Sequence, residues 1–74
     1  MKLSEVGSGS SARIVAVKGG SPFKKRLMEM GFMRGEEIYK VKLAPLADPA
    51  EYIVKGYHVS LRAEEADDII VEPM

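Results

Sequence analysis

The sequence has no cysteine and no tryptophan, and it has a single histidine. Without cysteine the chain can form no disulfide and can offer no thiolate to a metal ion, a composition that fits a reducing cytosol. Transition-metal sites need about three or four converging ligands of suitable type. Because His58 has neither a cysteine nor a second histidine to join it, we expect a surface imidazole, no metal-ligand set and no cofactor.

The sequence also lacks an excess of either charge and lacks a long apolar run. Eleven basic and eleven acidic residues give a formal net charge of zero, which argues against a dedicated nucleic-acid binder. No apolar stretch approaches the roughly 18 residues of a transmembrane helix, and the first residues lack the apolar run of a secretory signal. We expect one cytoplasmic domain over residues 1–74, with no direct membrane insertion.

No set of side chains typical of catalysis is present. The segment Gly19-Gly20-Ser21 precedes a helix but lacks the lysine and spacing of a phosphate-binding loop. Residues 64–68 hold four carboxylates without the ligand spacing and glycine of an EF-hand. We interpret them as a solvated acidic turn, with a weak Mg²⁺ or Ca²⁺ site at Asp67 and Asp68 as the alternative. We therefore predict that the protein is not an enzyme.

The stretch from Ser21 to Gly35 predicts one short helix with a start and a stop. Ser21 is a suitable N-cap, and Pro22 suits the first helical position because its missing N–H would be unpaired there. Gly31 is placed for a left-handed stop, after which Phe32 is expected to fold back onto Leu27. One face carries three apolar residues at i, i+4 and i+7, namely Phe23, Leu27 and Met30.

Three basic residues break a local rule in this helix. Lys24, Lys25 and Arg26 occupy the first turns, where the helix dipole favours negative charge. Each conflict costs about a few tenths of a kcal/mol at an exposed site. The residues therefore form either an ordinary solvated face or a basic patch kept for an acidic partner.

Five short strands are predicted, with turn residues between them. They span residues 12–18, 36–44, 50–55, 57–62 and 69–71. We expect a tight turn ending at Gly35, a hairpin turn at Lys55-Gly56 and one helical turn over residues 63–66. The whole predicts a mainly β fold: a small bent barrel of about five strands, with a short helix inserted after the first strand.

Three finer expectations concern the strands. The first strand is apolar on both faces, which favours cover on both sides. In the second strand, a bulge near Ile38 would bring both apolar sets to the core. In the fourth strand, alternation predicts three inward side chains, Tyr57, Val59 and Leu61.

Taken in order, the motifs closely resemble those of the FeoA family of small ferrous iron transport proteins. The resemblance covers Leu3 to about Val71 and is carried by RLMEMGF at residues 26–32, APLADP at 44–49 and LRAEEADDIIV at 61–71. Arg34-Gly35 stands where the family usually has a proline–glycine turn. The resemblance implies an SH3-like barrel in the cytoplasm, acting beside the membrane iron transporter FeoB, which carries a cytosolic GTPase domain.

The expected function is therefore a non-enzymatic accessory role: docking on the cytosolic part of FeoB to support its assembly or regulate its activity. We do not expect the protein to carry iron itself. A regulatory module resembling the C-terminal domain of metal-dependent repressors is the alternative, although residues 1–74 contain no helix-turn-helix domain. Weak self-association is also compatible with the sequence.

The candidate partner-binding residues are of three kinds. Met28 and Met33 lie off the core face of the helix, and methionine side chains repack readily against a partner. Leu46 is a candidate exposed apolar residue in the proline loop. Tyr52 and Tyr57 could line a groove for an extended proline-rich segment, although core packing is the preferred interpretation for both. With the basic patch, the set is Lys24, Lys25, Met28, Met33, Leu46 and Tyr52.

Overall fold

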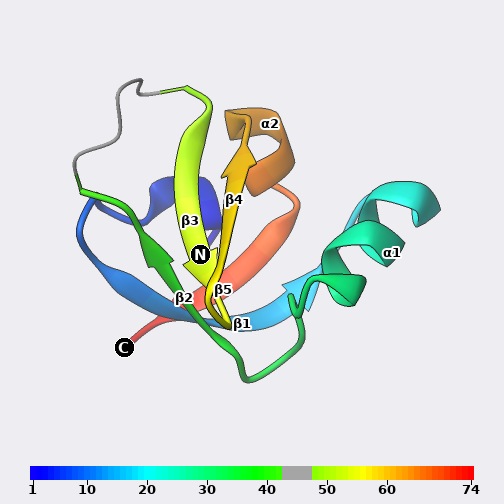
Figure 1. The fold of residues 1–74 in the computed structure, drawn as a ribbon, viewed down its shortest axis with the longest axis horizontal. Helices are drawn as coiled ribbons and strands as arrows, with labels where there is room; N and C mark the ends of the chain where they lie inside the picture. Colours follow the sequence, from blue (N-terminus) through cyan, green and yellow to red (C-terminus); the bar gives the residue numbers. More distant parts are fainter. Residues whose placement is uncertain (43–47) are drawn as a thin grey trace.

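The structure, a computed structural model, describes residues 1–42 and 48–74 and consists of one curved antiparallel sheet with short helices around it (Figure 1). The elements in chain order are η1 Leu3–Glu5, β1 Ser11–Val17, α1 Ser21–Glu29, β2 Glu37–Lys40, β3 Ala50–Val54, β4 Tyr57–Leu61, α2 Ala63–Ala66 and β5 Ile69–Pro73. The strand order is β4-β3-β2-β1-β5. The predicted mainly β architecture, with a helix after β1 and a helical turn before β5, is confirmed.

The core lies on the inner face of the curved sheet. Burying a large apolar side chain stabilises the fold by about 1.5–3 kcal/mol, so this cluster supplies the main driving force. Its buried members are Leu3, Val6, Ala12, Ile14, Leu27, Phe32, Ile38, Tyr52, Val54, Val59, Leu61, Ala66, Ile69 and Val71. Helix α1 contributes Leu27 to this cluster, with Phe23 and Met30 packed against it.

The outer edge of β5 is covered by the beginning of the chain. The amino group of Met1 donates to the carbonyl oxygen of Val71 at 2.9 Å, and the Val71 N–H donates back to Met1 O at 2.8 Å. Lys2 also forms a β-bridge with Ile70. These contacts protect an edge that would otherwise expose unpaired backbone groups.

The predicted stop of α1 is confirmed. Gly31 adopts φ 98°, the Gly31 N–H donates to Met28 O at 3.1 Å, and the Phe32 N–H donates to Leu27 O at 2.9 Å. This pair of bonds is a Schellman motif, which satisfies the last carbonyls and turns the chain back. Leu27 and Phe32 are both completely buried as a result.

The predicted start of α1 is wrong by one residue. Gly20, not Ser21, is the N-cap, with φ −67° and ψ 153°, and Ser21 is the first helical residue. Glycine is tolerated at the N-cap because it imposes no steric constraint there. Arg26 links the helix to α2 through an ion pair with Glu65 at 3.8 Å. Away from these contacts, α1 projects sideways from the barrel (Figure 1).

The predicted bulge near Ile38 is wrong. Ile38 pairs in regular register with both Ala12 and Val54, and β2 ends at Lys40. The next inner position of β2 is filled by Lys40, whose Nζ donates to Val6 O at 3.1 Å. Because the aliphatic stem of this lysine can cover apolar surface while its ammonium reaches an acceptor, no second apolar set is needed there.

Two other expectations about burial are also corrected. In β1 only the face carrying Ala12 and Ile14 is buried, and Arg13 is exposed, so β1 is not covered on both sides. The strand irregularity lies here instead, between Ile14 and Ala16 where β1 pairs with β5. In β4, Val59 and Leu61 point inward as predicted, but Tyr57 is 58% exposed.

Tyr57 is exposed because of its place in the sheet. It opens β4, an edge strand with a neighbouring strand on one side only, and it directly follows the predicted Lys55-Gly56 turn, which has φ 50° and 81°. Neither the edge nor the turn provides a side chain to cover the ring. Alternation alone therefore overestimates burial at the ends of edge strands.

We predict that Gly31→Ala lowers the free energy of unfolding by about 1–2 kcal/mol, the cost of forcing an L-residue into the left-handed region. A Cβ at this position would also lie 3.0 Å from the Lys55 side chain. Urea denaturation followed by circular dichroism measures the change. Gly7→Ala is the control, since a Cβ there meets only the Ser10 hydroxyl oxygen, at 3.7 Å. Equal stability of the two variants would contradict this account of the helix stop.

Candidate functional site

The structure brings most of the candidate partner-binding residues to α1 and the turn after it. Lys24, Lys25 and Met28 lie on the outer face of the helix, and Met33 follows its end. Tyr52 does not join them. Leu46 lies outside the described residues.

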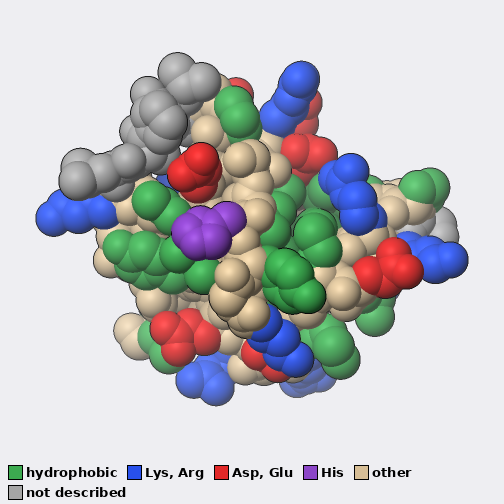
Figure 2. All heavy atoms as spheres, viewed as in Figure 1, with side chains coloured by type: hydrophobic (Ala, Val, Ile, Leu, Met, Phe, Trp, Pro, Cys, Tyr) green, Lys and Arg blue, Asp and Glu red, His purple; other side chains and the backbone are tan. Residues whose placement is uncertain are grey.

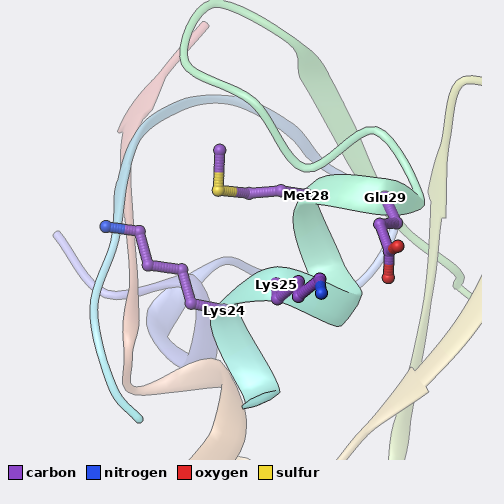
Figure 3. Close-up of a pocket in the computed structure, with 4 residues that line it drawn as sticks. All are labelled: Lys24, Lys25, Met28 and Glu29. Atoms are coloured by element: carbon purple, nitrogen blue, oxygen red, sulfur yellow. The ribbon is translucent and has the colours of Figure 1, made fainter. Parts of the chain in front are cut away.

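The outer face of α1 is hollowed between its side chains. A depression of about 480 Å³, open to solvent, is lined by Lys24, Lys25, Met28 and Glu29. Lys24 and Met28, one helical turn apart, extend to the same side, whereas Glu29 points elsewhere (Figure 3). Glu29 was not among the predicted site residues. The signal that could have identified it is its position four residues after Lys25, because such residues are neighbours on a helix surface.

Two methionines on and just after this helix are exposed. The exposed fractions are 47% for Met28 and 49% for Met33. Neither residue is needed to fill the core, since the buried face of α1 is complete with Phe23, Leu27 and Met30. Met28 lines the depression on α1, and Met33 follows the end of the helix. We call the set Lys24, Lys25, Met28 and Met33 the α1 surface.

The first half of α1 carries positive charge and no acidic residue. The first turn has no acidic residue, so the positive end of the helix dipole and the lysines reinforce each other. Arg26 is engaged, with Glu65 at 3.8 Å and with its guanidinium 6.0 Å from the centre of the Phe23 ring. Within residues 1–42 and 48–74, no ion pair involves Lys24 or Lys25.

Tyr52 is corrected to a core residue, because its side chain is only 1% exposed. It lines a cavity of about 130 Å³ together with Lys40 and Asp48. Burial raises the pKa of the Tyr52 phenol, and the nearby Asp48 carboxylate raises this pKa further. Asp48 also accepts a hydrogen bond from the Ala63 N–H at 3.0 Å and so holds the first turn of α2.

The acidic turn near α2 has structural partners. The Glu65 carboxylate accepts from the Arg62 N–H at 2.9 Å, and Asp67 accepts from the Ser4 hydroxyl. In the part of the chain that the structure describes, no three His, Cys, Asp or Glu side chains are grouped so as to hold a metal ion. His58 lies exposed on β4, on the face shown in Figure 2.

Within the described ranges, no helix is long and apolar enough to cross a membrane. Lysines, arginines and carboxylates are also interspersed on the face shown in Figure 2. This mixture matches the zero formal net charge and is unlike the continuous basic stripe of a nucleic-acid footprint.

Comparison with known proteins identifies relatives along the whole chain. The family model described as "FeoA domain" matches residues 1–73. A curated fusion protein of Fe(2+) transport protein A and the Fe(2+) transporter FeoB, from Porphyromonas gingivalis, is 50% identical over 72 residues. That match covers 97% of this chain and only 8% of the fusion protein.

Solved structures of FeoA proteins share the fold. FeoA of Chlorobium tepidum superposes with a TM-score of 0.90 at 35% identity, covering 100% of this chain and 70% of that one. FeoA of Stenotrophomonas maltophilia, solved with zinc and described as a prokaryotic SH3 domain protein, gives 0.85 at 32% identity over 97% and 89% of the two chains. The predicted SH3-like fold is thereby confirmed. A manganese-dependent transcriptional repressor, at 13% identity, shares the fold alone.

We predict that the Tyr52 phenol ionises at a higher pH than a free tyrosine side chain. Since its pKa is raised in the folded protein, the neutral buried phenol contributes to stability below pH about 10, and the contribution is lost as pH rises above the unfolded pKa. Ultraviolet absorbance of the phenolate, compared with Tyr52→Phe, measures this. The variant should lose an ionisation step that lies above the ordinary tyrosine pKa of about 10. If it retains that step, the assignment is wrong.

Proposed function

The chain belongs to the FeoA family, and we propose that it docks on the cytosolic part of a FeoB-type iron transporter through the α1 surface. The FeoA domain is a non-enzymatic accessory domain of ferrous iron transport. This agrees with the lack of a catalytic group in the α1 surface. The proposed action is to support assembly of the transporter or to regulate its activity.

The observation that carries the proposal is the fusion relative. In that protein a segment 50% identical to this chain belongs to the same polypeptide as FeoB. Covalent linkage keeps two modules at a high effective concentration, which favours a contact between them even when it is weak. The two modules are joined in one chain in that relative, which supports an association between them when they are separate proteins. The chain spans only 8% of the fusion protein, so transport itself belongs to the remainder of that protein in this proposal.

The α1 surface is the part of the fold best suited to the contact. Helix α1 projects from the barrel (Figure 1), so a partner can reach Met28 and Met33 without disturbing the sheet. The helix is held from the other side by the fully buried Leu27 and Phe32. A rigid element with flexible apolar side chains on its free face is a common arrangement for recognition. Docking of this kind places the protein in the cytoplasm.

The repressor-like alternative has the shared fold as its only support. Shared architecture at this level of identity carries no information on function, because function depends on the site and not on the fold. The α1 surface gives that alternative no additional support.

We predict that Met28→Asp and Met33→Asp each weaken binding to the purified cytosolic part of the transporter by about tenfold or more. Each change places a charge in a contact proposed to be apolar. Both side chains are half exposed, so the fold should survive. Isothermal titration calorimetry measures the binding, and circular dichroism checks the fold.

Met74→Asp is the matched control, since Met74 is also exposed, at 61%, and lies at the end of the chain away from α1 (Figure 1). It should leave the affinity unchanged. Binding that is equally tight in all three variants would remove the α1 surface from the proposal. A lack of binding by the unmodified protein would refute the proposed partnership itself.

A further inference from the structure

We infer that the partner segment received by α1 is acidic: its carboxylates pair with Lys24 and Lys25 while one of its apolar side chains packs against Met28. This inference rests on the proposed function and adds the chemistry of the partner. It comes from the charge arrangement and the shape of the outer face of α1.

The charge arrangement is unfavourable for α1 in the free protein. Lys24 and Lys25 directly follow the first turn of α1, which has no acidic residue, whereas Arg26 lies in the last turn. The two lysines form no ion pair among residues 1–42 and 48–74, and the positive end of the helix dipole nearby gives them no compensating attraction. A carboxylate bound at this place would reverse the sign of the interaction, because it is attracted by both the lysines and the dipole.

Two of the three cations are available to a partner. Arg26 is engaged by Glu65, 3.8 Å away. Lys24 and Lys25 are exposed and take part in no ion pair among residues 1–42 and 48–74. Two adjacent ammonium groups without acidic partners therefore mark the first half of the helix.

The shape of the face adds an apolar component. Lys24 and Met28 extend to the same side of α1 (Figure 3), and the depression of about 480 Å³ that they help to line is open to solvent. It is large enough for a side chain from a partner, with the Met28 thioether and the Lys24 stem as apolar walls. Met33, also exposed, extends the apolar area beyond the helix end.

Glu29 gives the contact a direction. It lines the same depression but lies near the C-terminal end of α1, one turn beyond Lys25. A partner carboxylate close to Glu29 would be repelled, whereas one close to the lysines is attracted. The acidic part of the segment is thus assigned to the start of α1, and its apolar part to Met28 and Met33.

An acidic protein segment fits these features better than a phosphate polymer or an anionic lipid surface. Phosphates would use the lysines, but they would leave the exposed Met28 and Met33 without a function. A nucleic-acid binder would also carry excess positive charge, whereas this chain has a formal net charge of zero. The attraction between the two lysines and a partner carboxylate acts over a short distance. Added salt shortens the screening length, which is about 8 Å at physiological ionic strength, so pairing at Lys24 and Lys25 should weaken as the salt concentration rises.

The test measures binding to the cytosolic part of the transporter across a series of salt concentrations. We expect the double variant Lys24→Glu, Lys25→Glu to raise Kd about tenfold or more at low salt. The Kd of this variant should also change less with salt concentration than the Kd of the unmodified protein. The double variant should stay folded, since both side chains are exposed and neither belongs to the core. Each single variant, Lys24→Glu and Lys25→Glu, is measured as well, and Lys42→Glu, at an exposed lysine outside α1, is their single-charge control and should change Kd less than about twofold.

The possible outcomes separate this inference from the proposed function. If Met28→Asp weakens binding while the double lysine variant and the salt series leave Kd unchanged, the acidic-partner inference is refuted and the proposed docking stands. Recovery of binding by the double variant when a transporter carboxylate is changed to lysine would establish the pairing. Lysine-dependent binding to vesicles of anionic phospholipid, without binding to the transporter part, would overturn both.

Discussion

The fold depends on the sharp end of α1 at Gly31. Because this residue takes a left-handed conformation, the chain reverses at once, and Leu27 before it and Phe32 after it enter the same core. A helix that continued for another turn would carry Phe32 away from the sheet. The two buried side chains fix α1 beside the barrel and leave its opposite face free. The position of the proposed docking surface therefore follows from one backbone conformation.

The two faces of α1 have different roles. Residues on one face pack into the core and stabilise the domain. Residues on the other face contribute little to packing, so they can change to suit a partner. Met28 and the two lysines next to the depression belong to the second kind. In a domain of 74 residues, where the core is small, the exposed Met28 and Met33 are not needed for the core and remain available to the proposed contact.

Features set by neighbouring residues were predictable from the sequence, and those set by the assembled sheet were not. The helix stop at Gly31, the Lys55-Gly56 turn and the inward Val59 and Leu61 follow from local rules. The strand irregularity in β1 and the inner position of Lys40 depend on how β1, β2 and β5 meet. The exposure of Tyr57 required knowing that β4 is an edge strand. At the candidate site, the sequence separated Met28 and Met33 from the core face, but it did not decide between core and groove for Tyr52.

The pairing of Met1 with Val71 joins positions separated by 70 residues. Such a contact closes the largest loop available to the chain, and its entropic cost is paid only when the intervening strands are already aligned. The β3–β4 hairpin pairs neighbouring parts of the chain, but β5 lies between β1 and the first residues, so this edge of the sheet is complete only when both ends of the chain have come together. Pairing between distant parts of a chain slows folding in general, so we expect the contacts of Met1 and Lys2 with β5 to form after the strands between them have paired.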